Sequence, residues 1–148
     1  MKTTLDKATR DALISRMGNL NESSQAQWGK MNVSQMLRHC TAWEELVSGR
    51  QKFKQAFVGR IFGKMVLRRI LKDEAPLKRN TPTSPEFKIT TDGGNVKAEK
   101  ERWISLLQGH DQLSYDSIEH PFFGKMTLEQ IGYLAYKHTD HHLRQFGC

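Results

Sequence analysis

Residues 127–147 have the sequence TLEQIGYLAYKHTDHHLRQFG and carry the longest helical pattern in this 148-residue chain. Thr127 can cap the start of the helix with Gln130 at the capping-box position, and Gly147 stands where a helix ends. Side chains at i, i+3, i+4 and i+7 spacing form one stripe: Ile131, Leu134, Ala135, His138, His142 and Gln145. The pattern predicts an amphipathic helix whose buried side carries two histidines.

The pair His138 and His142 has the spacing of metal ligands. Residues four apart stand one above the other on a helix, so both rings can reach one ion. Burying two imidazole rings close together is costly unless they share a binding partner. A metal ion is such a partner, because both rings bind it as neutral lone-pair donors. The same spacing also fits two core histidines that are hydrogen-bonded to neighbours. His141 is turned about 60° from His138 on the helix and is expected at the flank of the site.

Four other segments show helical patterns and a capping or stop residue. They cover about 5–17, Asn32 to Gly49, about 53–71 and about 95–108. The segment 53–71 contains Gly59 and Gly63, which we expect to weaken or kink it. Its broad apolar face consists of Phe57, Ile61, Phe62, Met65, Val66 and Ile70. The stretch 73–94 predicts an irregular loop with a short extended piece at 86–91, and no sheet is predicted.

Helices that alternate with loops favour an all-α antiparallel bundle. The chain length fits a single domain over 1–148. The basic helix and its loop, 52–94, then form an insertion between the second and third bundle helices. In such a bundle His39 on the second helix can lie opposite the histidine pair, although a lone histidine there also fits the core. Three protein ligands leave one coordination position of the metal open. Catalytic zinc sites have this arrangement, whereas structural zinc sites have four protein ligands.

The net charge of +7 fits nucleic acid, an anionic membrane surface, an anionic substrate, or solubility alone. Arg60, Lys64 and Arg68 stand at i, i+4 spacing on the segment 53–72. This basic helix supports an alternative function, a non-catalytic protein that binds nucleic acid or an anionic surface. Nucleic acid is the less favoured partner because no known motif accompanies the helix and aromatic residues do not interleave with the basic face.

The compartment expected from the sequence is the cytoplasm. No run of 18 apolar residues predicts a membrane span, and the first residues lack the apolar stretch of a signal peptide. The two cysteines, Cys40 and Cys148, do not indicate a disulfide framework.

Three motifs resemble one branch of the DinB-like (YfiT-like) metalloenzymes, a branch catalogued as a domain of unknown function. The closing motif is YKHTDHHLRQFG at 136–147; the others are WGKM at 28–31 with QMLRHC at 35–40, and HPFFGKMT at 120–127. Together they span nearly the whole chain in the order found in that branch. The resemblance implies a four-helix bundle in up-down-down-up order. It also implies a three-histidine site for nickel or zinc, made here by His39, His138 and His142.

Relatives in that superfamily transfer low-molecular-weight thiols or act as isomerases or hydrolases. The resemblance therefore implies a metal-dependent thiol transferase or hydrolase whose reaction is not fixed by the fold. Imidazole ligands also suit iron and copper. A degenerate scaffold or a metal sensor with the same fold is a further alternative.

Several other residues are candidates for a role at or near the site. Glu44 or Glu45 could act as a general base if it faces inward. His120 could line the mouth of the site, although an ordinary loop histidine is the favoured interpretation. Asp140 and Arg144 could orient a ligand, or form a surface ion pair. Superfamily members often dimerise, and Phe122 and Phe123, expected to be exposed, would suit a homodimer interface or anchor a loop. His110 is assigned no function.

Overall fold

The computed structural model describes residues 1–148 and contains five helices and one small hairpin. The helices are α1 (Lys7–Met17), α2 (Val33–Val47), α3 (Phe57–Ile70), α4 (Val96–Gln108) and α5 (Leu128–Gln145). Short 3-10 turns cover Pro85–Phe87 and Gly109–Gln112, and the hairpin pairs β1 (Ser117–His120) with β2 (Gly124–Thr127). The chain is thus mostly helical, as predicted. None of its helices is long and apolar enough to cross a membrane.

Side-chain caps fix the starts of four helices. The predicted capping boxes of α2, at Asn32 and Gln35, and of α5, at Thr127 and Gln130, are both formed. Asp6 accepts a hydrogen bond from the Thr9 amide at the start of α1, and Asn95 does the same for α4. These caps satisfy amide groups that have no partner within the helix, which explains why helix boundaries follow the sequence closely.

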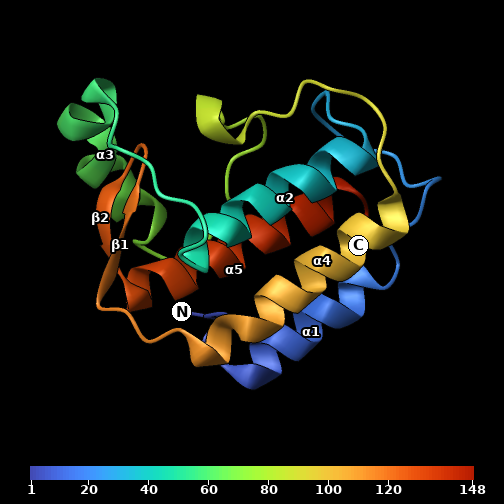
Figure 1. Cartoon of the computed structure of the whole chain (residues 1–148), viewed down its shortest axis with the longest axis horizontal. Coiled ribbons are helices and arrows are strands. Elements are labelled where there is room, and N and C mark those ends of the chain that lie inside the picture. The colour runs from blue at the N-terminus through green and yellow to red at the C-terminus, as the bar shows by residue number, and fades with distance from the viewer.

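The core lies between α1, α2, α4 and α5, which run side by side in Figure 1. One buried cluster joins α1, α2 and α4 around Trp103, which is fully buried. A second cluster joins α2 and α5 with the hairpin and the loop after α3, around Trp43 and Met126. The candidate histidines lie on α2 and α5, so both core clusters hold the two helices that carry the site.

The hairpin was not predicted from the sequence. Ser117 pairs with Thr127 and His120 with Gly124, in antiparallel register. Each strand has only four residues, too few for the alternation that identifies a strand in a sequence. The extended piece predicted at 86–91 was also wrong at its start, because Glu86 and Phe87 lie in a 3-10 turn.

Helix α3 packs through a side of the helix other than its apolar face. Its buried residues are Gly59, Gly63 and Leu67, whereas Phe57, Ile61 and other residues of the apolar face are exposed. A Cβ on either glycine would overlap the carbonyl oxygen of Phe122. The glycines therefore let the helix backbone lie directly on the hairpin turn. The helix is not broken at either glycine. On the hairpin side of this contact, Phe122 and Phe123 are partly buried rather than exposed.

We expect Gly63→Ala to lower the free energy of unfolding by about 1–3 kcal/mol. Helix propensity alone predicts the opposite sign, a gain of up to about 1 kcal/mol. The clash with the Phe122 carbonyl decides the sign because a backbone group cannot move aside cheaply. Urea unfolding measures the change. Gly109→Ala is the matched control, since a Cβ there meets nothing within 4 Å, and stabilisation by Gly63→Ala would contradict the packing described.

Candidate metal centre

The three predicted histidines meet at the face shared by α2 and α5. The Nε2 atoms of His39 and His138 lie 3.0 Å apart, across 99 positions of sequence. Each of the three residues offers one ligand atom, and these atoms all lie within 4.8 Å of one another. His39 and His142 are buried, and His138 is partly exposed. The structure thus brings together all three residues predicted as ligands.

Hydrogen bonds fix the tautomers of two of these rings. The Nδ1–H of His39 donates to the carbonyl oxygen of Phe87 at 2.9 Å. The Nδ1–H of His142 donates to Oε1 of Gln145 at 2.8 Å, and the Gln145 amide is oriented by its own donation to the Trp28 carbonyl. With a hydrogen on each Nδ1, both Nε2 atoms present a lone pair to the centre of the cluster. This is the arrangement that metal-binding histidines show.

The centroids of the three rings lie 4.7 to 5.0 Å apart, and His138 lacks a hydrogen-bond partner outside the cluster. Its Nδ1 atom is buried and has no hydrogen-bond partner, so its only hydrogen bond is to Nε2 of His39. Burial and the neighbouring His142 and His39 rings hold the pKa of His138 well below its ordinary value. Burial also lowers the pKa of His39, and it lowers the pKa of His142 to about 3. All three rings are therefore neutral at pH 7, the form that binds metal.

A divalent ion fits this cluster. Two imidazole nitrogens on one tetrahedral zinc, at about 2.0–2.1 Å each, are separated by roughly 3.3 Å. The separation of the His39 and His138 nitrogens is close to this value. Without an ion, the Nε2 atoms of His39 and His138 can share at most one hydrogen, because the hydrogen of His39 is on its Nδ1 atom. The buried Nδ1 atom of His138 then has no hydrogen-bond partner. The donor set of three neutral imidazoles suits zinc, nickel, copper or iron.

The cluster opens into a cavity of about 740 Å³. This volume is in the range of sites for small organic molecules. Its lining is largely apolar and aromatic and includes Trp28, Trp43, Phe87, Phe123 and the three histidines. Glu86 is the only acidic residue of the lining, and it is exposed. The cavity thus favours a ligand with a large apolar part.

His120 lines the same cavity, which was the less favoured of the two alternatives for this residue, and it is buried. The backbone amides of Phe122 and Phe123 both donate to its Nδ1 atom, each at 3.0 Å. Because Nδ1 accepts, the hydrogen of the neutral ring must lie on Nε2, which makes no hydrogen bond within the protein. Burial lowers the pKa of His120 to about 3, so the ring stays neutral. His120 is a fixed hydrogen-bond donor beside the three-histidine cluster.

The structure places the candidate general bases elsewhere. Glu44 is buried away from the cluster and accepts a hydrogen bond from Nε2 of His110 at 2.6 Å. His110 in turn bonds Thr4, so the residue to which we assigned no function joins α2 to the N-terminal segment. Glu45 pairs with Arg102 and with Gln51. Neither glutamate lines the cavity.

The residues around the closing motif take structural positions. Asp140 forms an ion pair with Arg16 at 2.7 Å and a longer one with Arg144 at 3.8 Å. Of the two alternatives for Asp140 and Arg144, the structure therefore shows the ion pair. His141 packs edge-on against Trp28 at the flank of the cluster, as its angle on the helix predicts. Gln145, which fixes His142, could have been found from its place on the same stripe. Phe87 could not, because its contribution is a backbone carbonyl.

Comparison with known proteins gives one match. A family model described as "Protein of unknown function (DUF1569)" matches residues 1–147. No curated protein and no solved structure matches the chain.

Proposed function

The chain belongs to this family of proteins of unknown function (DUF1569), and we propose that it is a metal-dependent enzyme with one divalent transition metal on His39, His138 and His142. The observation that carries the proposal is the orientation of the rings. The Phe87 carbonyl and Gln145 direct two Nε2 lone pairs toward a third imidazole at the end of an apolar cavity. A purely structural cluster would not need an adjoining cavity of this size.

We also propose that the family lies in the DinB-like superfamily, with the up-down-down-up bundle that the resemblance implies. The order of the three motifs and the positions of the three histidines on α2 and α5 support this. Nickel or zinc is the expected ion, with iron and copper as alternatives.

Thiol transfer is the reaction that the cavity supports best. A divalent ion on His39, His138 and His142 would supply Lewis acidity and would favour the thiolate form of a thiol near neutral pH. The cavity has no buried carboxylate that could act as a general base for hydrolysis, since Glu44 and Glu45 lie outside it. Thiol transfer needs no such base once the thiol is deprotonated. Apolar walls suit an electrophile with a large apolar part.

The chain's own residues have distinct parts in this reaction. The cavity walls hold the electrophile and exclude water. The thiol sulfur forms the new carbon–sulfur bond, the leaving atom takes the electron pair of the bond that breaks, and the thiol proton passes to solvent. His120 can donate a hydrogen bond from its Nε2–H group to the leaving atom, where negative charge develops, and it keeps its own proton. His120 is thus the proposed catalytic residue outside the metal ligands.

The test is thiol transfer to monobromobimane, whose carbon–bromine bond is replaced by a fluorescent thioether. We expect protein reconstituted with zinc or nickel to accelerate transfer from cysteine or glutathione by about 100-fold or more over the metal-free protein. His138→Ala should abolish the acceleration, and His120→Gln should lower kcat while metal content is retained. Equal rates with and without metal would overturn the thiol-transfer proposal. Metal-dependent cleavage of p-nitrophenyl esters alone would assign a hydrolase instead.

A further inference from the structure

The positive charge of the protein is concentrated in one segment. Residues 50–72 contain eight of the 23 Lys and Arg residues and none of the 16 Asp and Glu residues. The rest of the chain has 15 basic and 16 acidic residues and is therefore close to neutral. The segment carries Arg50, Lys52, Lys54, Arg60, Lys64, Arg68, Arg69 and Lys72. The net charge of +7 is thus a property of α3 and its flanks rather than of the whole surface.

The same segment holds the exposed apolar residues. Five of the six large hydrophobic side chains that are exposed lie on α3, and Phe57 is 74% exposed. They are Phe57, Val58, Ile61, Phe62 and Met65. Phe57, Ile61 and Met65 form one i, i+4 row, and Arg60, Lys64 and Arg68 form a neighbouring one. The glycine row faces the hairpin, so the apolar and basic rows face outward together.

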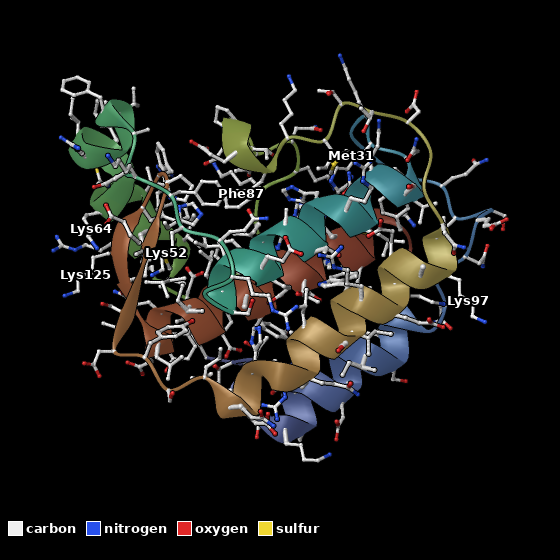
Figure 2. All side chains as sticks on the ribbon, viewed as in Figure 1. Met31, Lys52, Lys64, Phe87, Lys97 and Lys125 are labelled. Carbon is white, nitrogen blue, oxygen red and sulfur yellow. The ribbon has the colours of Figure 1, made fainter.

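Helix α3 lies at one end of the molecule, beside the hairpin and apart from the four core helices (Figure 1). Lys52, Lys64 and Lys125 gather at that end in Figure 2, whereas Lys97 lies at the opposite end. Val58 lines the cavity and is also 57% exposed, and Val66 and Ile70 line the cavity further along the helix. The apolar surface of α3 is therefore continuous with the wall of the cavity.

We propose that α3 docks the protein on an anionic lipid surface, with Phe57, Ile61 and Met65 in the interface and the cavity opening beside it. Interfacial helices combine a row of large apolar side chains with Lys and Arg that meet anionic headgroups. Such docking gives apolar molecules dissolved in the lipid a direct path to the cavity. The docking itself does not depend on the metal or on the proposed reaction.

Other occupants of this surface fit less well. A second copy placed symmetrically would bring the basic rows of both chains together without acidic partners on this segment. Nucleic acid would match the charge but leave the protruding aliphatic side chains Ile61 and Met65 in water. An anionic bilayer satisfies both the charges and the apolar row.

The experiment is co-sedimentation of the full chain with vesicles of phosphatidylcholine alone or with about 30% phosphatidylserine, at low and high salt. We expect binding only with phosphatidylserine and weaker binding at high salt. The double variant Arg60→Gln with Arg68→Gln should weaken binding to these vesicles roughly 30-fold. Each basic residue near the membrane surface contributes about 1 kcal/mol, and about 1.4 kcal/mol corresponds to a tenfold change in affinity. Phe57→Ser with Ile61→Ser should weaken it about tenfold or more, because these side chains lose their burial in lipid.

The matched control is Lys88→Gln with Lys97→Gln, which removes the same charge from exposed positions outside the segment. Equal weakening by this control would overturn the proposal, as would absent binding of the parent. An environment-sensitive fluorophore attached to the cysteine of Val58→Cys, in a Cys148→Ser background, should report the docking. Its emission maximum should shift to shorter wavelength only when anionic vesicles are added. If the serine variant instead converts a dimer to a monomer and the parent ignores vesicles, the surface is a dimer interface. Metal content is unaffected by either result, so this failure is separate from a failure of the proposed function.

Discussion

Replacing His138 with Ala is expected to lower the metal content of the protein from about one ion per chain to nearly none. His138 contacts both of the other proposed ligands, and its Nε2 atom is 3.0 Å from that of His39. Loss of a partner that only orients a ligand costs about 10–100-fold in metal affinity, and loss of a ligand should cost more. Elemental mass spectrometry on tag-free protein, after reconstitution with zinc or nickel, measures the effect.

The adjacent histidine provides the matched control for this experiment. His141 precedes His142 and contacts Trp28, but it is not one of the three clustered ligands. His141→Ala should therefore keep the metal. Gln145→Leu should weaken binding about 10–100-fold without removing a ligand, because His142 loses the bond that fixes its tautomer. If the parent takes up no transition metal, or if both histidine variants lose it equally, the metal site is wrong.

The metal-free protein is expected to lose several kcal/mol of stability between pH 6.5 and pH 4.5. Burial lowers the pKa of both His120 and His142 to about 3, whereas an unfolded histidine titrates near 6.5. Between these values the unfolded chain binds more protons than the folded chain, so stability falls as the pH falls. Each of these histidines contributes about 1.4 kcal/mol per pH unit, or roughly 5 kcal/mol for both at pH 4.5. That is a large part of the 5–15 kcal/mol typical of a domain.

Urea unfolding followed by tryptophan fluorescence at several pH values measures this dependence. The contribution of these groups is fully present above pH 6.5 and is lost as the pH falls toward 3. His120→Gln and His142→Gln should each flatten the dependence by about one proton, because glutamine does not titrate. A double variant with the same pH dependence as the parent would show that these two histidines are not the buried neutral groups described here.

Local features of the sequence predicted the helices and the clustering of the three candidate histidines. Helix ends depend on neighbouring side chains such as Asn32 with Gln35, which is why capping residues located them. The stripe on α5 placed His138 and His142 together because the helical period alone fixes their relation. His39 required a further assumption, that α2 and α5 face each other in an antiparallel bundle.

The features that the sequence did not predict share a cause, because each depends on a contact between segments that are distant in the sequence. Gly59 and Gly63 were expected to weaken or kink α3, yet they form its packing face, and a residue without a side chain gives no sign of such a contact in the sequence. The four-residue strands are stable only through their pairing and the helix that lies on their turn. Glu44 turns toward His110 rather than the cavity, and no local pattern determines which of two adjacent glutamates faces inward.

The bond between His39 and Phe87 links the metal centre to the wall of the cavity. Phe87 accepts the His39 hydrogen through its carbonyl and lines the cavity as part of the segment between α3 and α4. A ligand that holds this segment in place also holds His39 in its metal-binding tautomer. Thermodynamic reciprocity then requires each occupant to strengthen the other by the same factor. If the proposed ion is bound, we expect occupancy of the cavity and retention of the ion to be cooperative, so the ion should be held least firmly when the ligand leaves.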